Sequence, residues 1–157
     1  MGHPVFVYGS LMRGLGNHEV LGPSVGDGTA GTLMAVDLEM VSLGAFPALV
    51  QRARAHADAN NAPKICGELY EVSDDTLRDL DMLEGHPRFY RRRLLPVYDR
   101  VHTCIVDAWV YAMGRTARDH EVKVEVTHRM VGGRGGLVSW RRHLSDRDCG
   151  LSQRGGA

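Results

Sequence analysis

A short apolar run near the start of the chain, Pro4 to Tyr8, is followed at once by Gly9 and Ser10. Consecutive apolar residues rich in valine favour a strand buried on both faces, because a helix of this length without a cap would be marginal. Gly9 permits a tight change of direction and would let an anionic group approach the backbone amides of Ser10 and Leu11. The alternative is that Gly9 and Ser10 form an ordinary turn. The sequence therefore predicts a buried strand that ends in a loop, which is either an anion site or a turn.

Length and charge restrict the class of protein. With 157 residues and 43% hydrophobic content, we expect one domain over residues 1–144, followed by a disordered polar tail at residues 145–157. The 19 basic and 19 acidic residues cancel, so no overall charge attracts nucleic acid or an anionic membrane. No apolar stretch approaches the roughly 20 residues of a membrane span, and no signal-peptide pattern is present. We expect a cytoplasmic monomer or weak dimer, with neither nucleic acid nor membrane as a partner.

Most of the remaining chain has the apolar and alternating patterns of short strands. Residues 99–102 are the expected turn of a hairpin, and Pro96 in its first strand predicts a sheet edge or a bulge, because proline lacks an amide. The polar residues 52–63 are the expected surface connection between two sheet segments. The expected strands cover residues 32–36, 38–43, 48–50, 65–72, 89–98, 103–111 and 121–126.

One helix carries an unusual carboxylate. Ser73 is expected to cap the helix, which ends near Gly85. At about 100° per residue, Glu84 projects within roughly 20° of Leu77, on the core-facing side. Burial of a carboxylate is costly and raises its pKa, so natural sequences tend to keep one there when it is paired or used. The alternative is that Glu84 reaches solvent at a frayed helix end, towards Arg88 or Arg91, and Asp81 is a competing acid. The core-facing arc is predicted to contain Leu77, Leu80 and Leu83.

Several kinds of catalytic or metal site lack support. Ser10 has no G-x-S-x-G context, and the eight histidines are scattered singly, without the spacing of metal ligands. The glycines near the start match neither a dinucleotide fingerprint nor a P-loop. The odd number of cysteines predicts no disulfide framework; Cys66 and Cys104 are expected to be small buried hydrophobes, and Cys149 lies in the tail. We expect no cofactor and no metal.

Two motifs together resemble a known family. Tyr8-Gly9-Ser10-Leu11 precedes Leu80-Asp81-Met82-Leu83-Glu84-Gly85-His86-Pro87, which is followed by Tyr90-Arg91-Arg92. This combination resembles the γ-glutamylcyclotransferase-like family, which includes the butirosin-pathway cyclotransferases, the γ-glutamylamine cyclotransferases and the plant AIG2-like proteins. The resemblance spans about residues 4–111, and Trp140-Arg141 is similar to the family's C-terminal tryptophan. Residues 114–136 match no segment of the family; they are expected to be a lid over the leaving-group side or a long loop.

The resemblance implies an α+β fold, a small mixed β-barrel flanked by short helices. It also implies a cofactor-independent enzyme that cleaves a γ-glutamyl amine or peptide and releases 5-oxoproline. Glu84 would be the catalytic acid and base, and the amides around Gly9 to Leu11 would hold the glutamyl α-carboxylate. The implied substrate-binding residues are Tyr8, Gly9, Ser10, Leu11 and Tyr90.

Two alternatives remain at this point. A fold does not fix a function, so the chain could be a non-catalytic member that binds a small ligand or a protein. The less favoured alternative is an amidohydrolase that uses Ser10 as its nucleophile and releases free glutamate. The sequence does not identify the amine that leaves.

Overall fold

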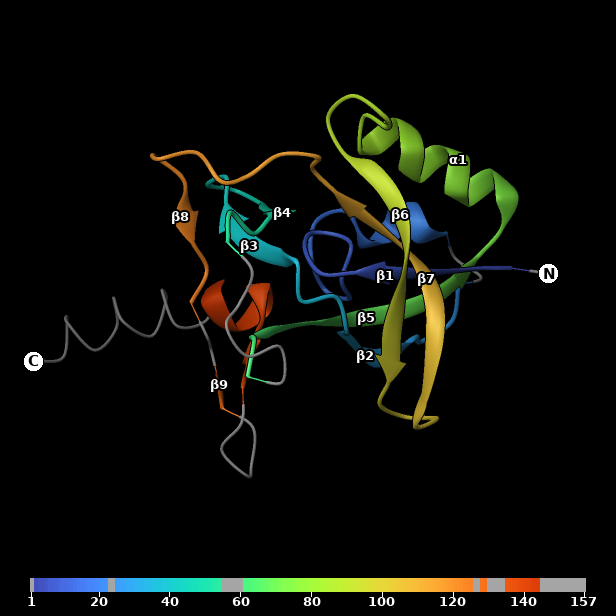
Figure 1. The fold of residues 1–157 in the computed structure, drawn as a ribbon. Coiled ribbons are helices and arrows are strands. Elements are labelled where there is room, and N and C mark those ends of the chain that lie inside the picture. Colours follow the sequence, from blue (N-terminus) through green and yellow to red (C-terminus); the bar gives the residue numbers. More distant parts are fainter. Residues whose placement is uncertain (1, 23–24, 55–60, 126–127, 130–134, 145–157) are drawn as a thin grey trace, which may run out of the picture.

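Five strands close into a mixed barrel, which confirms the expected fold (Figure 1). The computed structural model describes residues 2–22, 25–54, 61–125, 128–129 and 135–144, and the tail predicted at residues 145–157 lies outside them. Strand β1 is parallel to β7 and antiparallel to β5, and this second pairing closes the barrel. The barrel strands, in spatial order, are β1 (His3–Val7), β7 (Cys104–Ala112), β6 (Arg91–Asp99), β2 (Thr29–Leu33) and β5 (Lys64–Val72).

A second sheet lies beside the barrel, so the strands do not form a single sheet. It consists of β4 (Pro47–Gln51), β3 (Leu38–Ser42) and β8 (Val122–Lys123), in that order. The barrel sheet is itself extended from β5 by β10 (Gly136–Val138) and β9 (His128–Arg129). The strand expected at 121–126 is therefore only two residues long within the described part of the chain.

Pro96 explains why β2 ends earlier than predicted. The expected strand at 32–36 is observed at 29–33, where Leu33 pairs with Val97 of β6. The amide of Met34 donates to the carbonyl of Pro96 at 3.0 Å, but proline has no amide with which to continue the ladder. Strand β6 pairs with β7 in one uninterrupted register, so the predicted alternative of a bulge at Pro96 is wrong. The observed effect of Pro96 is that β6 stops pairing with β2 on the opposite edge of the strand.

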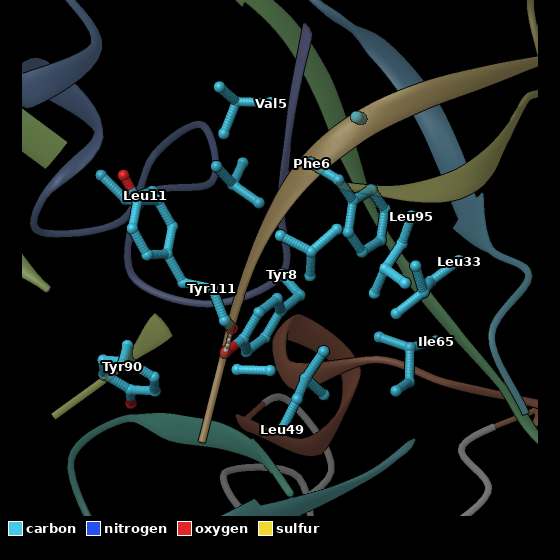
Figure 2. Packing of buried hydrophobic residues seen from close by; sticks show 14 of the residues in the cluster. Val5, Phe6, Tyr8, Leu11, Leu33, Leu49, Ile65, Tyr90, Leu95 and Tyr111 are labelled. Carbon is cyan, nitrogen blue, oxygen red and sulfur yellow. Dashed lines mark hydrogen bonds between the residues drawn. The ribbon is translucent and has the colours of Figure 1, made fainter. Parts of the chain in front are cut away.

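The barrel interior is filled by apolar side chains from all around the wall (Figure 2). Val5 and Phe6 of β1 are almost completely buried, as the apolar run predicted. On β5, Ile65 and Leu69 are buried on one face and Tyr70 on the other, because other parts of the chain cover both faces of that strand. Burial of this many apolar side chains is the main favourable contribution to folding.

The predicted helix is confirmed as α1 (Asp74–Leu83). The Ser73 hydroxyl accepts a 3.1 Å hydrogen bond from the Thr76 amide at its start, and Gly85 terminates it with a φ of 64°. The prediction that Leu83 belongs to the buried arc is wrong: Leu83 is 44% exposed, because the helix ends over a cavity there. The short 3₁₀ helix η1 (His18–Leu21) contacts α1, and a helical turn at residues 140–144 buries Trp140.

Burial of the cysteines differs from the prediction. Cys66 is half-buried, but Cys104 is exposed because it begins β7 next to the turn of the hairpin. Cys149 lies outside the described residues. In the described part of the chain, no helix is long and apolar enough to cross a membrane.

Candidate active site

A cavity of about 400 Å³ lies where β1 ends, next to the end of α1 and the segment that enters β4. The structure brings all the sequence-predicted site residues to this one cavity. They come from two segments that are far apart in the chain, and they are Tyr8, Gly9, Ser10, Leu11, Glu84 and Tyr90. Among the described residues, no three His, Cys, Asp or Glu side chains gather as ligands of one metal ion.

The loop after β1 is held by its own backbone. The Met12 amide donates to the Gly9 carbonyl at 2.9 Å, and the Asn17 amide donates to the Ser10 carbonyl at 2.9 Å. The amides of Ser10 and Leu11 donate to no acceptor among the described residues. Unpaired amides at a cavity wall are the groups that bind an anion in backbone nests. The loop can therefore receive a carboxylate.

Gly9 is needed for a different reason from the predicted one. Its φ is not positive, so the loop does not require the conformational freedom of glycine at this position. A Cβ atom at Gly9 would instead lie 2.8 Å from Cγ of Pro47, the first residue of β4. Because the second sheet approaches the loop so closely, a side chain at this position would require the loop or Pro47 to shift.

The Ser10 hydroxyl accepts a 3.0 Å hydrogen bond from Nδ2 of Asn17. No carboxylate or imidazole among the described residues bonds to this hydroxyl. A serine nucleophile needs an adjacent base to remove its proton. The arrangement therefore suits a positioned loop residue better than a nucleophile.

Glu84 lies at the end of α1, where its backbone amide donates to the Leu80 carbonyl at 2.9 Å and its carbonyl accepts from the Tyr90 amide at 3.1 Å. These bonds hold both sides of the residue. Its carboxylate forms no ion pair or hydrogen bond with a described residue, and burial raises its pKa from 4.5 to about 7. The predicted alternative, a carboxylate paired with Arg88 or Arg91, is not observed. A carboxyl with this pKa can accept and return a proton near neutral pH.

The competing acid, Asp81, is held in a structural cluster. Its Oδ1 accepts a 2.9 Å bond from Nε of Arg92 and a 2.7 Å bond from the Tyr111 hydroxyl. Burial alone raises the pKa of Asp81, but these hydrogen bonds and the charge of Arg92 outweigh it and bring the pKa below its usual value. Asp81 therefore stays ionised and occupied, which leaves Glu84 as the acid that faces the cavity.

Tyr8, Tyr90 and Tyr111 line the cavity together with Glu84, and their hydroxyls are directed to protein acceptors. Figure 2 shows these three side chains. The Tyr8 hydroxyl donates to the Tyr111 carbonyl at 2.6 Å, and the Tyr90 hydroxyl donates to the Pro47 carbonyl at 2.9 Å. Burial, together with the negative charge of Glu84, raises the pKa values of Tyr8 and Tyr90. The rings therefore stay neutral and provide a low-polarity wall.

Sequence reasoning missed Tyr111 and Pro47 as lining residues. Tyr111 was placed at the end of an expected strand, but the parallel pairing of β7 with β1, which brings it to the cavity, had no local signal. Pro47 was identified only as a residue that separates two expected strands. The packing of β4 against the loop decides its role.

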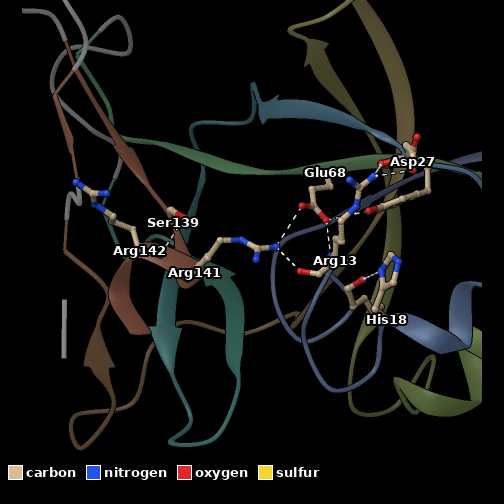
Figure 3. A network of polar contacts seen from close by, with 9 residues as sticks. Arg13, His18, Asp27, Glu68, Ser139, Arg141 and Arg142 are labelled. Carbon is tan, nitrogen blue, oxygen red and sulfur yellow. Dashed lines mark hydrogen bonds and ion pairs between the residues drawn. The ribbon is translucent and has the colours of Figure 1, made fainter. Parts of the chain in front are cut away.

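A polar cluster supports the loop from outside (Figure 3). Oε1 of Glu68, on β5, accepts from the Arg13 amide at 2.7 Å. Arg141, in the helical turn at 140–144, donates to the Arg13 carbonyl at 2.6 Å and lies 3.3 Å from Oε2 of Glu68. The Tyr70 hydroxyl also donates to Glu68 at 3.0 Å. A residue near the end of the chain thus fixes the loop that follows the first strand.

The chain that forms this cavity is similar to proteins of one known family. Residues 5–129 match the family described as "Gamma-glutamyl cyclotransferase, AIG2-like". A Vibrio cholerae protein with the provisional name gamma-glutamylcyclotransferase is 35% identical over 78% of this chain and 91% of its own length. The gamma-glutamylaminecyclotransferase of Bos taurus is 37% identical over 60% of this chain and 55% of its own length. A crystal structure of an AIG2-like protein from Mus musculus has a TM-score of 0.59 at 28% identity, covering 75% of this chain and 81% of that one.

Proposed function

Because the chain belongs to the gamma-glutamyl cyclotransferase, AIG2-like family and is an enzyme of the cyclotransferase type, we propose that it releases 5-oxoproline and a free amine from a γ-glutamyl amine or peptide. The observation that carries the proposal is the position of Glu84, a partly buried carboxylate that has no partner among the described residues and lies in the same cavity as the loop amides. The substrate is a small molecule, and the reaction needs no redox change.

The loop after β1 would bind the glutamyl end of the substrate. The amides of Ser10 and Leu11 would donate to the α-carboxylate, which leaves the α-ammonium directed towards Glu84. Tyr8 and Tyr90 would pack along the aliphatic part of the glutamyl chain. Fixing the amine and the γ-carbonyl in one geometry makes the ring closure effectively unimolecular, which removes much of the entropic barrier.

Glu84 would then carry protons from the α-nitrogen to the leaving nitrogen. The carboxylate takes a proton from the α-ammonium, and the freed amine attacks the γ-carbonyl carbon to form the new C–N bond of a five-membered ring. Protonated Glu84 gives this proton to the leaving nitrogen, and the bond from the γ-carbon to that nitrogen breaks. The ring nitrogen loses its second proton to Glu84, which passes it to the departing amine, so that 5-oxoproline keeps one hydrogen on its nitrogen and the amine leaves as an ammonium. A positioned acid and base of this kind contributes about 10² to 10⁴ in rate.

A direct test compares wild type with Glu84→Gln on a panel of γ-glutamyl compounds and quantifies 5-oxoproline. We expect release by wild type and a loss of about 10² to 10⁴ in kcat for the variant. Asp79→Asn, an exposed carboxylate on α1, is the matched control and should keep wild-type activity. No release from any compound, or an unchanged rate for Glu84→Gln, would falsify the proposal.

The two remaining alternatives give different results in the same assay. An amidohydrolase that uses Ser10 would release free glutamate, and Ser10→Ala would abolish that activity. In a cyclotransferase, Ser10→Ala only weakens the reaction, because the backbone amide is retained. A non-catalytic member would be stabilised by a γ-glutamyl ligand without turnover.

A further inference from the structure

A second cavity, of about 770 Å³, lies beside the first. Phe89 lines both cavities, and its ring makes an edge contact of 5.0 Å between ring centroids with Tyr90. The far wall is formed by the segment from Met113 to Val122, which is fixed to β4 where the Met113 amide donates to the Leu49 carbonyl at 2.8 Å. This wall lies within residues 5–129, which match the family, although the two sequence motifs did not include it.

Basic side chains dominate the second cavity. Arg88 and Arg91 line it from the segment that follows Glu84, and Arg115 and Arg118 line it from the far wall. Glu121 is the single acidic residue among the described lining residues.

Glu121 does not neutralise these arginines as a group. It forms a two-pronged ion pair with Arg115, at 2.7 and 2.8 Å, and accepts from the Arg118 amide at 2.8 Å. These hydrogen bonds lower the pKa of Glu121 to about 2, so its charge is permanently engaged in holding the wall. Arg88 and Arg91 form no ion pair with any described residue. The cavity therefore keeps an excess of positive charge.

Three exposed apolar side chains line the first cavity, and one of them, Phe89, also lines the second. Phe46, Leu83 and Phe89 are 38%, 44% and 53% exposed. Exposed apolar groups at a cavity mouth favour an aliphatic part of a ligand over a charged one. A leaving amine would meet this apolar surface first and the arginines beyond it.

We propose that the arginine-lined cavity binds an anionic group on the leaving amine, so that the preferred substrates are γ-glutamyl derivatives of amines that carry an acidic group on an aliphatic chain. This inference rests on the proposed function, because the first cavity must hold the glutamyl end. Arg88 and Arg91 are the specificity-determining residues. Guanidinium groups bind carboxylates through paired, charge-assisted hydrogen bonds, which gives both affinity and direction.

The test uses three substrates of equal chain length. These are the γ-glutamyl derivatives of 5-aminopentanoate, pentylamine and 1,5-diaminopentane, whose far ends are anionic, neutral and cationic. We expect kcat/KM for the anionic compound to exceed that for the neutral one by roughly tenfold or more, since a hydrogen bond to a charged group contributes about that much. The cationic compound should be the poorest, and added salt should reduce the differences.

Variants of the two arginines test whether these residues cause the preference for the anionic compound. Arg88→Gln and Arg91→Gln should each lower kcat/KM for the anionic compound roughly tenfold and leave the neutral compound unchanged. Arg78→Gln, an exposed arginine on α1 with the same change in net charge, should change neither. The inference is wrong if anionic and neutral compounds react equally, or if the Arg88 and Arg91 variants slow both alike. If none of the three compounds yields 5-oxoproline, the proposed function itself fails.

Discussion

The carboxylate of Asp81 accepts a 2.7 Å hydrogen bond from the hydroxyl of Tyr111, and this bond ties the last turn of α1 to strand β7. Tyr111 also accepts from Tyr8 through its backbone carbonyl. One residue therefore connects the helix end that carries Glu84 to the strand end that carries the loop. The relative position of the two halves of the cavity depends on this connection.

Removal of the connection should loosen Glu84 without changing its chemistry. Tyr111→Phe should destabilise the fold by about 1.5–3 kcal/mol, the contribution of a hydrogen bond to a charged group, and lower kcat at temperatures well below unfolding. Thermal unfolding and initial rates measure the two effects. Asp75→Asn removes a carboxylate from an exposed pair with Arg78 and should change little. A Tyr111→Phe variant as stable and active as wild type would contradict this assignment.

The partly buried carboxylate of Glu84 should reduce stability at neutral and alkaline pH. Burial raises its pKa from 4.5 to about 7, so the folded state binds this proton more tightly than the unfolded chain. The stabilising contribution is present below pH 4.5 and is lost as pH rises through about 7. Glu84→Gln should therefore become more stable than wild type across this window, by up to about 3 kcal/mol above it. Denaturant unfolding at several pH values measures the difference, and a difference independent of pH would contradict the prediction.

The same pKa should appear in the rate. The ionised carboxylate is the form that accepts a proton, so kcat/KM should rise with pH and level off above about 7. The profile is measured with one substrate over pH 5 to 9. If the rate instead falls off near the ordinary glutamate pKa, the pH dependence belongs to another group. The same conclusion follows if the residual activity of Glu84→Gln still shows the pH dependence.

The contact between Gly9 and Pro47 can be tested by a pair of substitutions. Gly9→Ala places a Cβ 2.8 Å from Cγ of Pro47 and should displace the loop, at a cost of about 1–3 kcal/mol and with a raised KM. Gly16→Ala in the same loop meets no atom within 4 Å and serves as the control. Adding Pro47→Ala removes the colliding ring atoms and should restore part of the lost affinity. An equal effect of the two alanines would show that flexibility, rather than this contact, is what the loop needs.

Glu68 should act on the loop through the backbone of Arg13. Glu68→Ala removes the acceptor of the 2.7 Å bond from that amide and the partner of Arg141, so we expect a KM increase of roughly tenfold with a smaller change in kcat. Steady-state kinetics measure KM and kcat separately. The Tyr70 pKa, which burial and Glu68 raise to about 12, should also fall, as an absorbance titration would show. Glu71→Ala, at an exposed position on the same strand, is the control.

Local sequence determined the individual strands and the helix of this protein. The apolar run at Val5 to Val7 made a buried strand, Ser73 capped a helix, and Gly85 ended it, because these effects depend on neighbouring residues only. The same local reasoning put Glu84 on the core-facing side of its helix. Together with the motif resemblance, this predicted six of the residues that line the cavity, but not Tyr111 or Pro47.

Tertiary structure decided how the pieces meet. The closure of the barrel through β1 and β5, the separate sheet that brings Pro47 against Gly9, and the exposure of Leu83 all depend on contacts between distant residues. So does the difference between two acids three positions apart. Asp81 accepts hydrogen bonds from Arg92 and Tyr111, whereas the Glu84 carboxylate has no hydrogen-bond or ion-pair partner among the described residues, and burial raises its pKa. A helical period can place a carboxylate on a face, but only the packed neighbours decide whether it is paired or left to exchange protons.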